Sequence, residues 1–277
     1  MILGASESFG LYEAAGREYP AQLAQALQKS GCYEVVNAAV AGMSVRSMHA
    51  LWTHWASRFQ PHIVAIYPTP GFYLGSVSPS DVSTRRSPPH PSPWWTPRLM
   101  DRAVDRLEYP AFWQRRRVAG WLADARRGRP PSWLYQQVPE DRLRDFLDDL
   151  EALVLAVSAS GARPVLVTHA TAFHLPPKEN EMEALYAWYA SAPRATGLVP
   201  IEFEHAAAEG MRNLSRRHGL ALVDAAARMY GRREWFARDL SHFSEAGAGA
   251  MADLIALHIA GQHHDKASTA GSVHAVQ

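Results

Sequence analysis

The chain has 277 residues, 47% of them apolar and 20% charged, and a formal net charge of +1. This length allows one large α/β domain or two small ones with a sizeable core, and the near-neutral charge gives no overall attraction to nucleic acid or to an anionic membrane. The single cysteine, Cys32, excludes an internal disulfide and a multi-cysteine zinc site. No apolar run has the length of a membrane span and no signal peptide opens the sequence, so we expect a soluble protein from the sequence as written.

Helix-like and strand-like segments alternate toward both ends of the chain. Apolar residues at helical spacing predict helices over residues 19–30, 44–59, 143–160, 202–218 and 244–261. Short apolar runs predict strands over residues 33–39, 62–67, 163–169 and 220–224, and residues 1–3 form the stub of a further strand. Such alternation is typical of a parallel sheet with helices on both faces. We therefore expect a three-layer α/β/α sandwich with a parallel sheet of about five strands.

The alternation is lost between residues 74 and 139. This stretch contains SPPHPSPWWTP, whose prolines break any strand, and residues 81–130 hold eleven Arg against five acidic residues. We expect an insertion or lid, helical in part, that leaves the sheet after the third strand. Residues 1–73 and 140–262 then form one α/β domain, and residues 263–277 form a disordered tail. The Arg-rich insertion is expected to be a solvated face, with binding of an acidic glycan, a lipid or nucleic acid as the alternative.

The segment ARDLSHFSEAGAGAMA, residues 237–252, contains the most informative spacing in the sequence. Asp239 precedes His242 by three residues, so on a tight turn the carboxylate can orient the imidazole and stabilise the imidazolium that forms when His242 accepts a proton. Ser244 is the better cap for the helix that follows, with Glu245 favourable in its first turn. This leaves Asp239 and His242 for catalysis.

The first residues, MILGASESFG, contain a Gly-x-Ser turn directly after an apolar stub. A serine exposed at the end of a strand becomes a nucleophile when a base such as His242 lies against it. Ser6 is the favoured candidate, and Ser8 is the alternative because GASES also fits the pattern. Ser8 is two residues further on, in the expected first turn of a helix. Without the distant histidine, Ser6 would be read as an ordinary helix cap.

Three blocks in this order, LGASESFG, NAAVAGMS and DLSHFSEAGAGAMA, resemble the SGNH/GDSL family of serine hydrolases. The resemblance spans nearly the whole chain and implies the flavodoxin-like sheet of the SGNH hydrolase fold. It implies cleavage of a carboxylic ester by a triad in which Ser6 attacks, His242 transfers the proton and Asp239 orients His242. The backbone amides of Ser6 and Gly42 then hold the oxyanion. No cofactor and no metal are implied, and the spacing of His62, His169 and His174 does not suit a metal site.

Two positions depart from the family pattern. Ala5 stands where Asp is usual, and IVAIYPTPGFYL has Pro70 or Gly71 where the family has the Asn of Gly-x-Asn-Asp. That Asn supplies one oxyanion donor, and losing one donor typically lowers the rate by about 10²–10³. Thr69 is the nearest replacement. Two alternatives stay open. An O-acyltransferase acting on a polysaccharide can reuse the same triad, and the two departures favour a weakly catalytic binding module that retains the fold.

The expected substrate is a small-molecule or glycan ester, and no nucleic-acid partner is expected. Trp94 and Trp95 in the insertion can stack on a sugar ring or pack on an acyl chain. His169 follows a predicted strand at the edge where ligands bind, so it either lines the pocket or is a hydrogen-bonded structural residue. Acyl-chain length and oligomeric state are left open by the sequence.

The stub before Ser6 is shorter than an ordinary strand. We therefore expect the natural chain to begin upstream, through a misassigned start or a trimmed sequence. A periplasmic or membrane-anchored location is then the alternative to a soluble one, with membrane contact only through the missing segment.

Overall fold

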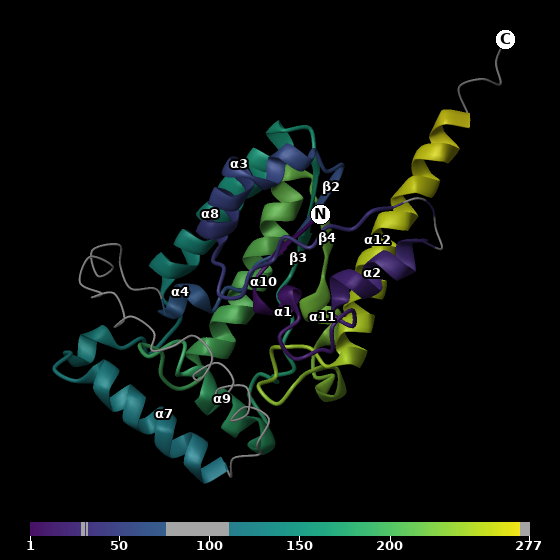
Figure 1. Ribbon diagram of the computed structural model, residues 1–277. Helices are drawn as coiled ribbons and strands as arrows, with labels where there is room; N and C mark the ends of the chain where they lie inside the picture. Colours follow the sequence, from purple (N-terminus) through teal and green to yellow (C-terminus); the bar gives the residue numbers. More distant parts are fainter. Residues whose placement is uncertain (29–30, 32, 76–110, 272–277) are drawn as a thin grey trace, which may run out of the picture.

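The computed structural model describes residues 1–28, 31, 33–75 and 111–271 (Figure 1). Most of the expected lid, including Trp94 and Trp95, and the last part of the expected tail lie outside the described residues. Among the described residues, no helix combines the length and the apolar character needed to cross a bilayer.

The core of the fold is a parallel sheet, as the sequence predicts. Its four strands are β1 (Ile2–Gly4), β2 (Ile63–Tyr67), β3 (Arg163–Val167) and β4 (Ala221–Val223), in the spatial order β1-β2-β3-β4. The register places Leu3 beside Ile66, and Ile66 beside Leu166. All strands run in one direction, so their carboxyl ends meet at one edge.

The expected strand over residues 33–39 is not a regular strand. It makes one parallel bridge to β1, between Ile2 and Asn37, supported by hydrogen bonds from the Ile2 amide to the Val36 carbonyl (2.8 Å) and from the Ala38 amide to the Ile2 carbonyl (2.9 Å). Because β1 has only three residues, it offers few backbone partners to a neighbour. Counted with this segment, the order is 2-1-3-4-5, the flavodoxin-like order.

Two helical layers cover the sheet (Figure 1). Side chains alternate along the strands, so Leu3 and Ile66 pack on one face while Ile2 and Tyr67 pack on the other. The first face is covered by α3 (Val45–His54), α8 (Glu140–Ala159) and α10 (Val199–His218). The second is covered by α2 (Tyr19–Gln28) and α12 (Glu245–Gly271). The expected three-layer sandwich is therefore confirmed.

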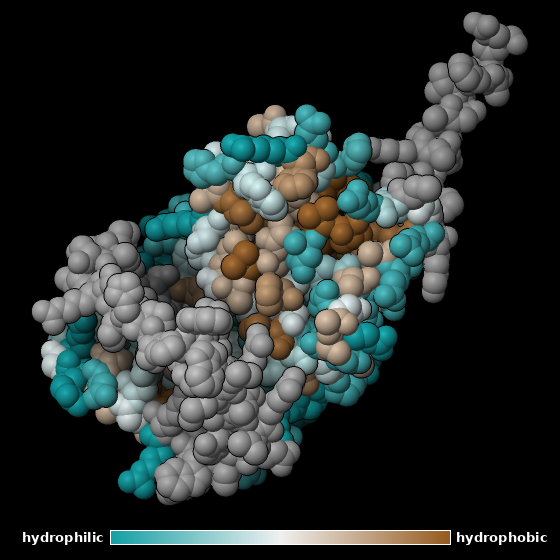
Figure 2. All heavy atoms as spheres, in the orientation of Figure 1, coloured by the Kyte–Doolittle hydropathy of each residue, from teal (hydrophilic) through white to brown (hydrophobic). Residues whose placement is uncertain are grey.

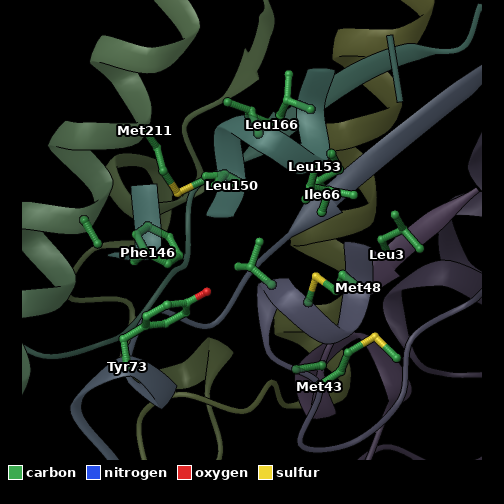
Figure 3. Close-up of a cluster of buried hydrophobic side chains, with 14 of the residues drawn as sticks. Leu3, Met43, Met48, Ile66, Tyr73, Phe146, Leu150, Leu153, Leu166 and Met211 are labelled. Atoms are coloured by element: carbon green, nitrogen blue, oxygen red, sulfur yellow. The ribbon is translucent and has the colours of Figure 1, made fainter. Parts of the chain in front are cut away.

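The first core shows why α8 forms a single long helix. Phe146, Leu150, Leu153 and Val157 recur at helical spacing and are fully buried. They pack among strand residues and Met211 of α10 in the cluster of Figure 3. Apolar side chains are also exposed in the middle of the face shown in Figure 2.

Two helix ends differ from the predictions. The helix predicted over residues 44–59 ends at His54 and is followed by the 3-10 helix η1 (Ala56–Phe59). The last helix continues past residue 261 to Gly271, so residues 263–271 of the expected disordered tail are helical. Gly261 does not end the helix because a glycine in a helix interior costs only about 1 kcal/mol relative to alanine.

Short helices fill the connections at the edge where the strands end. The ones that matter for the site are α1 (Ser6–Phe9), α4 (Phe72–Gly75), α9 (Met182–Trp188), α11 (Ala225–Met229) and η4 (Arg233–Trp235). From the insertion, α7 (Ala111–Arg126) packs against α9. The Arg126 guanidinium donates to the carbonyls of Pro193 (2.9 Å) and Ala195 (3.0 Å), which fastens this helix to the sandwich.

Close packing of η4 on α12 gives a stability prediction. A Cβ at Gly247, in the first turn of α12, would lie 1.7 Å from the Trp235 carbonyl oxygen. Gly247→Ala must therefore separate the two elements, and overpacking of this kind costs about 1–3 kcal/mol. We expect the melting temperature to fall by about 2–4 °C for each kcal/mol.

The matched control is Gly120→Ala in α7, where an added Cβ has no atom within 4 Å. This change should leave the melting temperature unchanged or raise it, since alanine favours a helix. Equal melting temperatures for the two variants would contradict the packing described for Gly247.

Candidate active site

A cavity of ≈ 1120 Å³ lies at the carboxyl ends of β1, β2 and β3, where ligands bind in open parallel sheets. It brings together five residues singled out from the sequence, which are Ser6, Thr69, His169, Asp239 and His242. Gly42 is exposed in a turn with φ of 80° and is not part of the cavity lining.

The turn after β1 presents Ser6 to the cavity and Ser8 to the core. Gly4 is required at the strand end because a Cβ there would lie 2.0 Å from Ser8 Oγ. Ser8 is fully buried and its hydroxyl is hydrogen-bonded to the Tyr19 hydroxyl at 2.7 Å. Ser6 lines the cavity at the start of α1. Of the two serines, Ser6 is therefore the one that a substrate can reach.

Asp239 and His242 form the pair that their spacing predicts. His242 Nδ1 lies 2.6 Å from Asp239 Oδ2, while Asp239 Oδ1 accepts the backbone amides of Ser241 (3.1 Å) and His242 (3.0 Å). Leu240 between them has a left-handed backbone with φ of 62°, held by its buried side chain. Ser244 caps the following helix as expected, since its Oγ accepts the Gly247 amide at 3.2 Å.

Electrostatics prepare His242 to accept a proton. Burial opposes the charged forms of both partners, but their mutual hydrogen bond and attraction outweigh it, so the pKa of His242 is raised and that of Asp239 is lowered. Because Asp239 accepts from Nδ1, the lone pair of neutral His242 is on Nε2. That nitrogen is buried and has no hydrogen-bond partner among the described residues. The Tyr12 ring packs beside the imidazole at 4.9 Å between centroids.

The Ser6 hydroxyl does not point at His242 in this structure. It donates instead to Glu7 Oε2 at 3.2 Å. Attack on a carbonyl with His242 as base therefore requires the Ser6 hydroxyl to turn from one acceptor to the other.

Sequence reasoning missed two carboxylates at the floor of the cavity, Glu7 and Glu204. His169 lies between them, with Nε2 at 3.3 Å from Glu7 Oε1 and Nδ1 at 2.8 Å from Glu204 Oε2. All three residues are buried. The sequence could have indicated Glu7 as a site residue, because it directly follows Ser6. Glu204 is one of many polar residues in a helix, so no sequence feature marks it as part of the site.

This arrangement makes His169 an imidazolium. Burial alone would lower its pKa, but the charges and hydrogen bonds of Glu204 and Glu7 raise it to about 10. Burial would likewise raise the pKa of Glu7, but hydrogen bonding to His169 and the charge of His169 lower it to about 2. The floor of the cavity is therefore a cation between two carboxylate side chains.

The segment in place of Gly-x-Asn-Asp is tied to the same carboxylates. The Thr69 hydroxyl donates to Glu7 Oε2 at 3.1 Å, and the Gly71 amide donates to Glu204 Oε1 at 3.1 Å. Thr69 can serve as an oxyanion donor only by leaving Glu7.

Within the described ranges, no group of three or more His, Cys, Asp or Glu is arranged to hold a metal ion.

The charge on His169 predicts a loss of stability at alkaline pH. A histidine whose pKa is raised on folding stabilises the protein fully below its unfolded pKa of about 6.5, and that contribution is lost as the pH rises through its folded pKa. Between about pH 7 and about pH 9, the unfolding free energy of the wild type should fall relative to that of His169→Gln by up to about 1.4 kcal/mol per pH unit. Urea unfolding at several pH values measures this difference, and parallel curves for the two proteins would contradict a charged His169.

Comparisons with known proteins place the fold. No protein-family model and no curated protein match the chain. A lipolytic protein of the G-D-S-L family from Desulfitobacterium hafniense matches with a TM-score of 0.52 at 13% identity, over 93% of this chain and 97% of its own. A lipase/acylhydrolase from Enterococcus faecalis matches with a TM-score of 0.52 at 17% identity, and the match covers 94% of this chain and 95% of that protein. An acetylxylan esterase from Geobacillus stearothermophilus matches with a TM-score of 0.53 at 14% identity, and the match covers 93% of this chain and 92% of that protein. The chain has the SGNH/GDSL hydrolase fold that its motifs predict.

Proposed function

We propose that this protein hydrolyses carboxylic esters, with Ser6 as the nucleophile, His242 as the general base and Asp239 as the residue that orients His242. The observation that carries the proposal is the 2.6 Å Asp239–His242 pair, whose buried Nε2 lacks a partner among the described residues and shares a cavity with Ser6. A buried acceptor without a donor is costly, so such a group is typical of a site that receives its partner during reaction.

The reaction follows from these positions. Ser6 Oγ attacks the ester carbonyl carbon as its proton moves to His242 Nε2, which gives a tetrahedral oxyanion. The C–O bond to the alcohol then breaks, the alcohol leaves with the proton from His242, and the acyl group remains on Ser6. Water repeats the sequence and releases the acid. The Ser6 amide at the start of α1 is the proposed oxyanion donor nearest the reacting carbon, since Gly42 lies outside the cavity lining and the Thr69 hydroxyl is bonded to Glu7.

The proposed substrate is an acyl or O-acetyl ester on a carbohydrate. One wall of the cavity is apolar and comes from α7 and α9, through Val118, Trp121, Ala184 and Ala187. Trp121 is 45% exposed, so its ring is available to stack on a sugar. Two neighbours in fold are described as an acetyl xylan esterase and an acetyl-xylooligosaccharide esterase, which agrees with a carbohydrate ester.

Labelling with a fluorophosphonate tests the nucleophile. Wild-type protein should be labelled at Ser6, and Ser6→Ala should lose both labelling and hydrolysis of a short-chain ester. Ser8→Ala is the matched control, because Ser8 is buried against Tyr19 and should cost about 1 kcal/mol of stability without preventing labelling. Mapping of the label to Ser8, or labelling that persists in Ser6→Ala, would overturn the assignment.

Replacement of Trp121 tests whether the insertion acts as a lid that selects the substrate. Trp121→Ala should lower kcat/KM for an acetylated xylo-oligosaccharide by up to about ten-fold, since aromatic contacts contribute about 0.5–1.5 kcal/mol, while labelling by a small probe should change little. The control is Arg127→Ala in the turn directly after the same helix, which changes a side chain that is 79% exposed and outside the cavity. An unchanged preference between large and small esters in Trp121→Ala would contradict this role.

A further inference from the structure

Glu7 accepts hydrogen bonds from four segments that meet at the cavity. Its donors are the Ser6 hydroxyl (3.2 Å) in the nucleophile turn, the Thr69 hydroxyl (3.1 Å) after β2, His169 Nε2 (3.3 Å) after β3, and the Ser241 hydroxyl (3.4 Å) in the loop of Asp239 and His242. One side chain therefore joins the nucleophile to the loop that carries the base.

The Glu7 carboxylate has no capacity left for a ligand. Ser6 and Thr69 share Oε2, while His169 and Ser241 share Oε1, so each oxygen has two donors. The residue is only 2% exposed. A buried and fully bonded carboxylate acts on a reaction through the groups that it holds and through its charge.

The charge of Glu7 is kept by the residues behind it. His169 donates to Glu7 on one side and is held by Glu204 on the other, and both His169 and Glu204 are buried. A buried anion beside a fixed imidazolium stays ionised over the range in which a serine hydrolase works. Besides Asp239, the titratable groups that act on His242 are Glu7, His169 and Glu13.

Outside this network the chain contains another buried glutamate paired with a histidine, which serves as an internal comparison. Glu181 is 4% exposed, lies 2.5 Å from His174 Nδ1 and accepts the backbone amides of His174 and Lys178. Its hydrogen bonds stay within the segment around residues 174–181 and reach neither Ser6 nor the His242 loop. Glu7 therefore differs from Glu181 because its hydrogen bonds join segments that are far apart in the sequence.

We propose that Glu7 is a positioning residue, which aligns the Ser6 turn with the Asp239–His242 loop and stabilises the His242 imidazolium by its negative charge. This inference rests on the proposed hydrolase function. When substrate binds, the Ser6 hydroxyl turns to His242, and Glu7 Oε2 keeps the hydrogen bond from Thr69. Rotation of the Ser6 hydroxyl therefore breaks a single hydrogen bond of 3.2 Å and does not leave the buried Glu7 carboxylate without donors.

The test compares the pH dependence of fluorophosphonate labelling at Ser6 in the wild type, Glu7→Gln and Glu181→Gln. Labelling requires neutral His242, so its rate rises with pH through the pKa of His242. Glu7→Gln keeps the shape and removes the charge, so the midpoint should move to lower pH. The plateau rate should fall by about ten- to hundred-fold, because small misplacements of reacting groups have effects of this size. Glu181→Gln should leave the midpoint where the wild type has it.

An unchanged midpoint in Glu7→Gln, an equal shift in Glu181→Gln, or a faster plateau in Glu7→Gln would each overturn the proposal. If circular dichroism shows that Glu7→Gln is unfolded, Ser241→Ala replaces it, since it removes only the link from Glu7 to the base loop. It should lower the labelling rate with little change in melting temperature, and an unchanged rate overturns the proposal.

Failure of the hydrolase assignment gives a different result. If wild-type protein is not labelled at Ser6, the proposed function fails, and NMR titration of the His242 ring still decides the present question. Its midpoint should be lower in Glu7→Gln than in the wild type, and equal midpoints overturn the charge role of Glu7.

Discussion

The imidazolium of His169 between two buried carboxylates is the interaction on which the cavity depends. Glu7 comes from the turn after β1, His169 follows β3 and Glu204 lies in α10, so three distant parts of the chain meet at one cation. Removing one member of a buried ion pair typically costs about 3–5 kcal/mol, because the remaining charge is left without compensation. The network therefore penalises any arrangement in which these strand ends separate, and it fixes the floor on which Ser6 lies.

The same network accounts for the unusual segment after β2. A chain that runs Thr69-Pro70-Gly71 has no side-chain amide to offer an oxyanion, but its hydroxyl and its Gly71 amide bind Glu7 and Glu204. A Cβ at Gly71 would lie 3.2 Å from Glu204 Oε1, so glycine allows the backbone to approach the carboxylate closely. In this protein the segment contributes to the order of the site through the acidic floor. On the proposed mechanism, oxyanion stabilisation then depends mainly on backbone amides.

The parts that the sequence predicts are those determined by local spacing. Asp239 and His242 are three residues apart on one turn, and the Gly4-x-Ser6 turn follows directly from a strand, so neither needs knowledge of the fold. The His169 network combines residues 35 and 162 positions apart, and no local pattern indicates such pairs. The strand expected over residues 33–39 failed for a related reason, because regular pairing requires a distant partner strand as well as local apolar residues, and the segment makes only one bridge to β1.

The cavity joins two structural sources with different physical characters. Its floor is polar and belongs to the ends of the strands, where buried charges hold Ser6 and Thr69 through hydrogen bonds to Glu7. Its wall is apolar and includes α7 of the insertion, which is fastened to the sandwich by Arg126 and adds Val118 and Trp121. Apolar contact area can change with little effect on hydrogen bonds several residues away, whereas each charge in the floor affects the others. Under the proposed function, substrate preference can therefore change through the wall while the chemistry at Ser6 remains the same.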